Sequence, residues 1–138
     1  MDRVATIADG VVYDESKKTL SDGWNCQDGV FSAFWVISPQ GRRWQVKARF
    51  LSTSTLVMTS PDEEVSFVLV SEGRGIRTVF DSERPGYELA RIIREDSLGR
   101  GCFGVYAGEG DLRDNLDDWL LAAALATWSV DGPRQVRI

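Results

Sequence analysis

The chain has 138 residues, of which 43% are hydrophobic and 27% charged, a composition typical of one globular domain. A chain of this length buries a core without disulfide or metal staples. Its net charge of −5 argues against non-specific nucleic-acid binding, which requires a basic footprint. The chain contains no histidine, which excludes His-based catalytic triads, imidazole metal ligands and imidazole pH switches. An enzyme is therefore less expected, and only one using carboxylates, Lys, Cys or Tyr stays open.

The cysteines and the N-terminus bear on compartment and cofactors. Cys26 and Cys102 form no CxxC pair, so neither a zinc site nor a redox motif is indicated, and we expect two buried free thiols. The opening MDRVATIADG has no apolar run, and the apolar segment near the C-terminus is too short to span a bilayer. The sequence predicts a cytoplasmic protein with no transmembrane segment, no metal and no cofactor.

Most of the chain predicts short strands. Residues 4–7 and 10–13 suit edge strands, and residues 14–21 suit a polar loop. Strands separated by turn signals then follow and indicate a barrel or a strongly curved sheet, with residues 87–94 interpreted as strand although a helical turn also fits. In chain order, these later strands are expected at residues 31–38, 44–50, 55–59, 65–70, 76–80, 87–94 and 102–107.

The clearest alternation lies at residues 44–50, which follow a predicted type I turn, Ser38-Pro39-Gln40-Gly41. Period two with one polar face predicts a half-buried antiparallel strand. The residues expected to face inward are Trp44, Val46, Ala48 and Phe50, and those expected to face outward are Gln45, Lys47 and Arg49.

The segment DDWLLAAALATWSV near the C-terminus has no polar stripe behind its two leading acids. A helix that is apolar all round must be enclosed by other elements. Asn115 with Asp118 resembles a capping box, and Gly132 followed by Pro133 ends the helix. The sequence therefore predicts an α+β single domain: a mainly antiparallel, barrel-like or strongly curved sheet enclosing a C-terminal apolar helix at about residues 115–130.

Three patterns resemble functional motifs: a glycine-rich loop of the kind that binds dinucleotide phosphates, and two pairs of acids that could serve acid–base chemistry. Residues 99–104, GRGCFG, match GxGxxG, but they run into an expected strand without a βαβ unit and are interpreted as a turn. The acid pair Glu63-Glu64 would point to opposite faces of a strand. The pair Asp117-Asp118 lies at the positive end of the helix dipole. A structural role is favoured for all of them, and no catalytic or metal-binding residue is assigned.

Arginines recur near the expected turns. A sheet face that collects Arg42, Arg43, Arg74 and Arg77 would bind phosphates or acidic lipid headgroups, so these four form the candidate ligand-binding surface. The alternative is a solvated face of mixed charge.

Aromatic side chains offer a second candidate surface. Trp24, Trp35 and Trp44 would line a ligand cavity or, as is more usual for inward strand positions, fill the core. An enclosed helix leaves little interior room for a ligand, so the core interpretation is favoured.

Three pieces of the chain carry a family resemblance: residues 34–46 (FWVISPQGRRWQV), residues 87–94 followed by 102–106, and residues 120–131 (LLAAALATWSVD). In this order they resemble the tubby C-terminal-like superfamily, which includes the LURP-one-related proteins and the phospholipid scramblases. The resemblance implies an antiparallel barrel around a hydrophobic helix and, in particular branches, phosphoinositide binding or scramblase activity. It assigns no site residue in this chain.

A pleckstrin-homology-like barrel is the runner-up fold. The terminal helix of that fold carries a Trp, which Trp119 or Trp128 would supply. However, such a helix caps an open end and keeps a polar face, and no polar face is visible in this segment.

These observations favour a non-enzymatic cytoplasmic binding or regulatory module. The alternatives are a phospholipid-headgroup-binding barrel, a protein-interaction or chaperone-type module, and a small enzyme that uses carboxylates. Clustered arginines would favour the first, an exposed apolar patch the second and a pocket with convergent carboxylates the third. The partner is a protein or an anionic headgroup, and a homodimer stays open.

Overall fold

The computed structural model describes residues 1–29, 33–49, 52–98, 101–107 and 117–132. These residues form strands, one short 3-10 helix and one α-helix. In chain order the elements are β1 (Asp2–Ala8), β2 (Val11–Asp14), β3 (Asn25–Asp28), β4 (Ala33–Ile37), β5 (Arg43–Arg49), β6 (Ser52–Thr59), β7 (Ser66–Gly73), β8 (Ile76–Asp81), β9 (Glu88–Arg94), η1 (Asp96–Leu98), β10 (Phe103–Ala107) and α1 (Asp118–Asp131).

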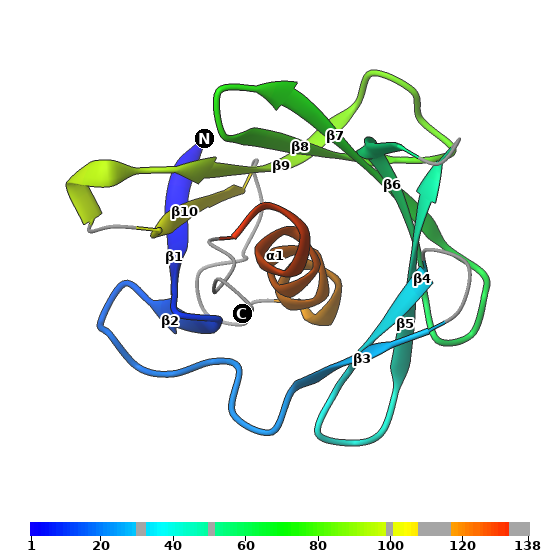
Figure 1. Ribbon diagram of the computed structural model, residues 1–138, viewed down its shortest axis with the longest axis horizontal. Helices are drawn as coiled ribbons and strands as arrows, with labels where there is room; N and C mark the ends of the chain where they lie inside the picture. Colours follow the sequence, from blue (N-terminus) through cyan, green and yellow to red (C-terminus); the bar gives the residue numbers. More distant parts are fainter. Residues whose placement is uncertain (30–32, 50–51, 99–100, 108–116, 133–138) are drawn as a thin grey trace, which may run out of the picture.

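The strands form a single ten-stranded sheet in the order β2-β1-β10-β9-β8-β7-β6-β5-β4-β3. Every neighbouring pair is antiparallel. The sheet curves around α1, so that β2 and β3 approach each other (Figure 1). Within the described residues no ladder joins β2 to β3. The predicted antiparallel, strongly curved sheet is confirmed, and the sheet is not closed into a barrel.

The core forms between the inner face of the sheet and α1. Residues 120–127 of the helix are all buried, which explains why the segment has no polar stripe. The Thr127 hydroxyl, the polar group in this run, donates to the Ala123 carbonyl at 2.8 Å and so needs no external partner. In β5 the burial alternates as predicted, with Trp44 and Val46 buried while Lys47 and Arg49 are exposed.

Arg77 of β8 fixes the C-terminal end of α1 to the sheet. Its guanidinium donates from Nε and Nη2 to the two carboxylate oxygens of Asp131, at 2.6 and 2.9 Å. It also donates to the carbonyls of Leu69 and Thr53, at 3.1 and 2.9 Å. Arg77 is only 2% exposed. A buried bidentate pair with its remaining donors satisfied sets the register of the helix against the strands, because breaking it would leave a buried charge unpaired.

The ends of α1 differ from the predicted caps. Asn115 and Pro133 lie outside the described residues. The N-cap residue is Asp117, which makes no side-chain capping bond, and Asp118 contacts Arg42 at 3.5 Å in place of a capping box. Gly132 does follow the helix, but with φ −67° it is not left-handed. A Cβ there would lie 2.4 Å from the Trp128 carbonyl oxygen, so lack of space requires glycine at this position.

The expected strands are found with small shifts in their ends, and the ambiguous residues 87–94 are strand β9. Phe31, Phe50 and the first two residues of the GRGCFG motif lie outside the described residues. The segment at residues 4–7 belongs to β1, which is not an edge strand because it lies between β2 and β10. The acid pair Glu63-Glu64 lies in the β6–β7 turn, where Glu63 has a φ of +63°.

Candidate binding site at the seam between β2 and β3

The free side of β2 is covered by the chain that follows it. The Leu20 amide donates to the Val12 carbonyl at 2.7 Å, and the Asp14 amide donates to the Lys18 carbonyl at 2.8 Å. The Val12 amide donates to the Ser21 hydroxyl at 2.9 Å. The segment expected to be a polar loop therefore satisfies the backbone groups that β2 would otherwise present to a further strand.

Among the described residues, none covers the free side of β3 in this way. The Gly29 amide donates to the Ala33 carbonyl at 2.9 Å, so Gly29 and Ala33 form a hydrogen-bonded pair. Hydrogen-bonded pairs recur at every second residue, so the next ones toward β4 are Gln27 with Trp35 and Asn25 with Ile37. Because such pairs alternate along an antiparallel ladder, the N–H and C=O groups of Cys26 and Asp28 point to the opposite side. No other described residue pairs with those groups. All four residues of β3 are exposed.

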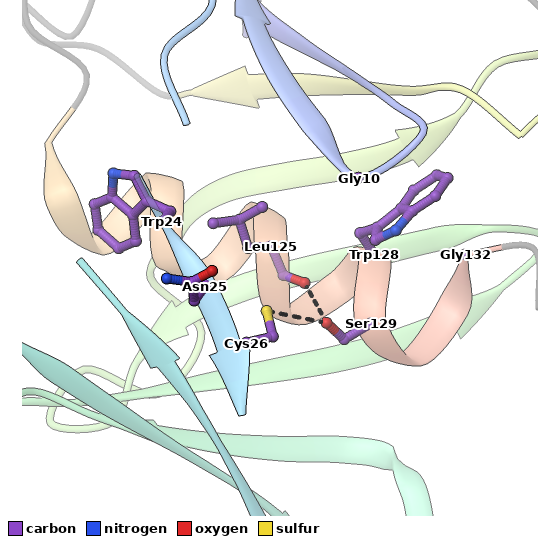
Figure 2. Close-up of a pocket in the computed structure, with 8 residues that line it drawn as sticks. All are labelled: Gly10, Trp24, Asn25, Cys26, Leu125, Trp128, Ser129 and Gly132. Carbon is purple, nitrogen blue, oxygen red and sulfur yellow. Dashed lines mark hydrogen bonds between the residues drawn. The ribbon is translucent and has the colours of Figure 1, made fainter. Parts of the chain in front are cut away.

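A cleft of about 420 Å³ lies beside this open edge, and we refer to it as the seam cleft. Figure 2 shows its floor formed by the last turns of α1 and one wall formed by β3, with Trp24 and Trp128 at its two ends. The β1–β2 turn closes the far side. The described lining residues are Gly10, Trp24, Asn25, Cys26, Leu125, Trp128, Ser129 and Gly132.

The Trp128 end of the seam cleft is held in place by packing. The indole lies edge-on to Phe103 of β10, with ring centroids 6.1 Å apart. On its other side, a Cβ at Gly10 would come within 3.0 Å of the indole Nε1. Gly10 also has a φ of +77°, so both the turn conformation and the close indole favour glycine here. The Trp128 indole is therefore held in one orientation by its packing and forms a fixed wall at this end of the seam cleft.

Cys26 and Ser129 connect β3 to the helix across the seam. The Ser129 hydroxyl lies 3.4 Å from the Cys26 sulfur and donates to the Leu125 carbonyl at 2.9 Å (Figure 2). Partial desolvation against the helix raises the pKa of the Cys26 thiol, the Ser129 hydrogen bond opposes this, and Asp28 adds to the rise. A raised pKa keeps the thiol neutral, so Cys26 is not an activated nucleophile. The expectation of two buried thiols is wrong for Cys26, which is exposed, and confirmed for Cys102; both are free.

A second cleft of about 510 Å³, the adjoining cleft, shares Cys26 and Ser129 with the first. It runs under β3 toward β4 and contains Asp28. The Cys26–Ser129 contact thus divides one groove along α1 into two parts. The described lining residues are Cys26, Asp28, Gly29, Ala33, Phe34, Ala48, Thr53, Leu56, Ser129 and Val130.

The four arginines predicted as one basic surface are dispersed. Arg42 and Arg43 are exposed beside the β4–β5 turn, at the end of the sheet where α1 begins. Arg74 is exposed in the β7–β8 turn, at the end where α1 stops. Arg77 is buried against Asp131 and is not a surface residue. They form no common face, because alternating turns of an antiparallel sheet lie at opposite ends of its strands.

The three tryptophans proposed for a cavity also separate. Trp24 lines the seam cleft. Trp44 belongs to the core at 5% exposure. Trp35 lies under the Arg43 guanidinium, which is 6.0 Å from its ring centroid. The core interpretation is confirmed for Trp44, Trp24 lines a cleft, and Trp35 does neither.

The carboxylates that lie together are already engaged. A third cleft, of about 380 Å³, contains Asp14 and Glu15 beside Arg3. Glu15 pairs with Arg3 at 3.1 Å, which raises the pKa of the guanidinium. Hydrogen bonds from the Lys18 amide and from Ser16 lower the pKa of Asp14. Asp14, which is held in its ionised form, is poorly suited to donate a proton, and Glu15, which is held in an ion pair, is poorly suited to accept one. The two carboxylates are therefore poor candidates for acid–base catalysis.

The outer face of the sheet carries apolar side chains across β6, β7, β8 and β9. Val57 lies opposite Val68, which lies opposite Phe80, and Ile76 lies opposite Ile93. These side chains are half-buried among their neighbours. They define an outer apolar face on the side of the molecule away from the seam (Figure 1).

Comparisons with known proteins assign no family: no family model matches the chain, and no curated protein or solved structure gives a significant match. Among the described residues, no group of three or more His, Cys, Asp or Glu side chains is placed to hold a metal ion. The described part of the chain also contains no helix with the length and apolarity needed to cross a membrane.

Sequence reasoning missed β3 and with it the seam. The residues of β3, NCQD, are polar, show no alternation and contain no β-branched or aromatic side chain. Gly23 and Gly29 flank the strand, but flanking glycines alone are equally typical of a loop. The strand forms because β4 offers a ladder, which is a tertiary cause.

Proposed function

We propose that the protein is a non-enzymatic binding module that captures an extended peptide segment by strand addition at β3. The observation that carries the proposal is the edge of β3 beside the seam cleft, which pairs with no described residue, whereas the equivalent edge at β2 is covered by residues 18–21. An extended segment would gain main-chain hydrogen bonds from Cys26 and Asp28, and its inward side chains would contact the floor formed by α1.

The proposal retains the sequence-based expectation of a binding module. It also retains a cytoplasmic location for the protein, which agrees with the free thiols of Cys26 and Cys102. The tubby-like resemblance belongs to the same proposal: a curved sheet around a C-terminal helix supports it, and an open seam departs from a closed barrel. Binding of phospholipid headgroups receives less support, because Arg42 and Arg43 lie far from Arg74.

The decisive test removes the hydrogen-bond donor at the open edge. In Cys26→Pro the ring replaces an N–H that faces away from β4, so the β3–β4 ladder stays intact. Cys26→Ala is the matched control, because it removes the thiol and keeps the N–H. Binders are first selected from a phage-displayed library of random linear nonapeptides, and their affinities are measured by calorimetry.

We expect the selected peptides to protect β3 amides from hydrogen exchange and to lose at least tenfold in affinity with Cys26→Pro. Their affinity for Cys26→Ala should change less than threefold. Equal binding to wild type and Cys26→Pro would refute strand addition at β3, as would protection confined to other strands.

The outer apolar face supports a second candidate function, docking of a folded protein. The Thr78 hydroxyl under this face is buried and has no hydrogen-bond partner among the described residues. A partner docked there would bind wild type and Cys26→Pro equally, so the same variant separates the two functions.

A further inference from the structure

We propose that the segment bound at β3 is cationic, with a Lys or Arg side chain opposite Asp28 and an apolar side chain two residues later, opposite Cys26. This inference rests on the proposed strand addition and specifies the chemistry of its partner. It follows from the charges that surround the groove, from a carbonyl at the end of α1 and from the register of β3.

The groove presents negative charge that no cation of the described structure neutralises. Asp28 lines the adjoining cleft and makes no ion pair with another described residue. Of the described residues that line the seam cleft and the adjoining cleft, none is Lys or Arg. Arg77 is directed at the Asp131 carboxylate, and Arg94 donates to the Asp131 carbonyl at 2.7 Å. Both arginines reach the helix end from β8 and β9, and Arg77 also donates to the carbonyl of Thr53, which lines the adjoining cleft, but neither arginine forms an ion pair with Asp28.

The last turn of α1 contains a carbonyl without a donor in the helix. The turn has no basic residue of its own, and the arginines that reach the helix end, Arg77 and Arg94, bond to Asp131 and not to Ser129. The Ser129 carbonyl has no helical donor, because the residue four positions later is Pro133, which lacks an N–H. Ser129 lines both clefts. A lysine or arginine side chain beside it would complement the dipole and Asp28 together.

The register of β3 gives the spacing of the bound segment. Cys26 and Asp28 lie opposite Val36 and Phe34, whose side chains belong to the core, so their own side chains face inward. In an antiparallel partner strand, the residue opposite Asp28 comes first and the residue opposite Cys26 comes two positions later, with both side chains inward. The second of these would contact Leu125 and Trp128. The expected pattern is Lys or Arg, any residue, then an apolar residue.

The same charge argues against a second copy of this chain as the occupant. Two β3 strands paired edge to edge would bring together two Asp28 carboxylates, and an inward-pointing charge is a common device against such pairing. A segment of opposite charge meets no such repulsion.

The test repeats the library selection on wild type, on Asp28→Lys and on Asp22→Lys. Asp22 is exposed and lines neither cleft, so Asp22→Lys reproduces the change in net charge without changing the groove. Wild type and Asp22→Lys should both enrich Lys or Arg two positions before an apolar residue, whereas Asp28→Lys should favour Asp or Glu there. Replacing the selected cation by glutamate should weaken binding to wild type by roughly threefold to tenfold, and less in 1 M salt.

Failure of this inference differs from failure of the proposed function. Selected peptides without charge enrichment, or with the same enrichment on Asp28→Lys, would overturn the cationic preference while their loss of binding to Cys26→Pro still supported strand addition. Peptides that bind Cys26→Pro as well as wild type would overturn both.

Discussion

The strands β2 and β3 are the two edge strands of the same sheet, but their free sides differ in how their backbone groups are hydrogen-bonded. Beside β2, residues 18–21 supply a carbonyl, an amide and a hydroxyl to Asp14 and Val12, so that edge is saturated. Beside β3, the corresponding groups of Cys26 and Asp28 pair with no described residue; Cys26 lines both clefts and Asp28 lines the adjoining cleft. An edge strand with unpaired backbone groups can pair with a strand of another chain, and proteins usually prevent this by covering the edge or by placing charged residues on it. Within the described residues, one edge is covered and the other lies open beside a cleft, and this difference supports the proposed pairing at β3.

Both edges depend on the enclosed helix, so the largest expected effect comes from removing it. Leu125→Asp places an unpaired carboxylate at a position that is 5% exposed. Burying such a charge costs an amount comparable with the whole stability of a domain, about 5–15 kcal/mol. We expect this variant to show no cooperative thermal unfolding by circular dichroism and no protected amides in β2 or β3. Ser129→Asp, one turn later and exposed, should still unfold cooperatively. A Leu125→Asp variant that melts near the wild-type temperature would mean that the helix is not enclosed.

A smaller effect should separate the two edges directly. Ser21→Ala removes the acceptor of the Val12 amide and should lower the free energy of unfolding by about 1 kcal/mol. Cys26→Ala removes a side chain at the uncovered edge, whose backbone groups have no described partner. This variant should lower the free energy of unfolding by about half as much as Ser21→Ala, or less. Urea unfolding of both variants measures the difference. Ser52→Ala is the control, because among the described residues this exposed hydroxyl hydrogen-bonds only with the Ser54 hydroxyl and amide. Equal losses for Ser21→Ala and Cys26→Ala would show that the two edges are equally covered.

The sequence predicts the parts of this comparison that depend on local pattern. An apolar run flanked by acids and Gly-Pro predicted α1, because an enclosed helix has no polar face. Alternation predicted β5, because burial on one face leaves a periodic signal. The strand β3 leaves none, since its polar residues become strand only by pairing with β4. Arg77 likewise resembled any exposed arginine in sequence, and its burial depends on Asp131, which lies 54 residues further along the chain. Pairings across such distances determine the seam, so the candidate binding site could not be predicted from the sequence, whereas the sheet and helix that hold it could.

The covered edge should also respond to acid. Hydrogen bonds from the Lys18 amide, the Ser16 hydroxyl and the Ser16 amide hold the pKa of Asp14 below its usual 3.8. A depressed folded-state pKa contributes stability that is present above the unfolded-state value and is lost as the pH falls through the folded-state value. We therefore expect the turn after β2 to stay ordered at pH 4 and to loosen below it. The effect should be small because Asp14 is accessible to water.

Amide chemical shifts of Ser16 and Lys18, followed by NMR between pH 6 and 2 (chosen to bracket the usual carboxylate range), would measure this loosening. Asp14→Asn keeps a side-chain acceptor without the charge and should remove the titration from both amides. A midpoint above 3.8 would contradict the assigned hydrogen bonds. If a pH-dependent shift of the β3 amides were also lost in Asp14→Asn, which leaves Asp28 unchanged, the two edges would be coupled through α1.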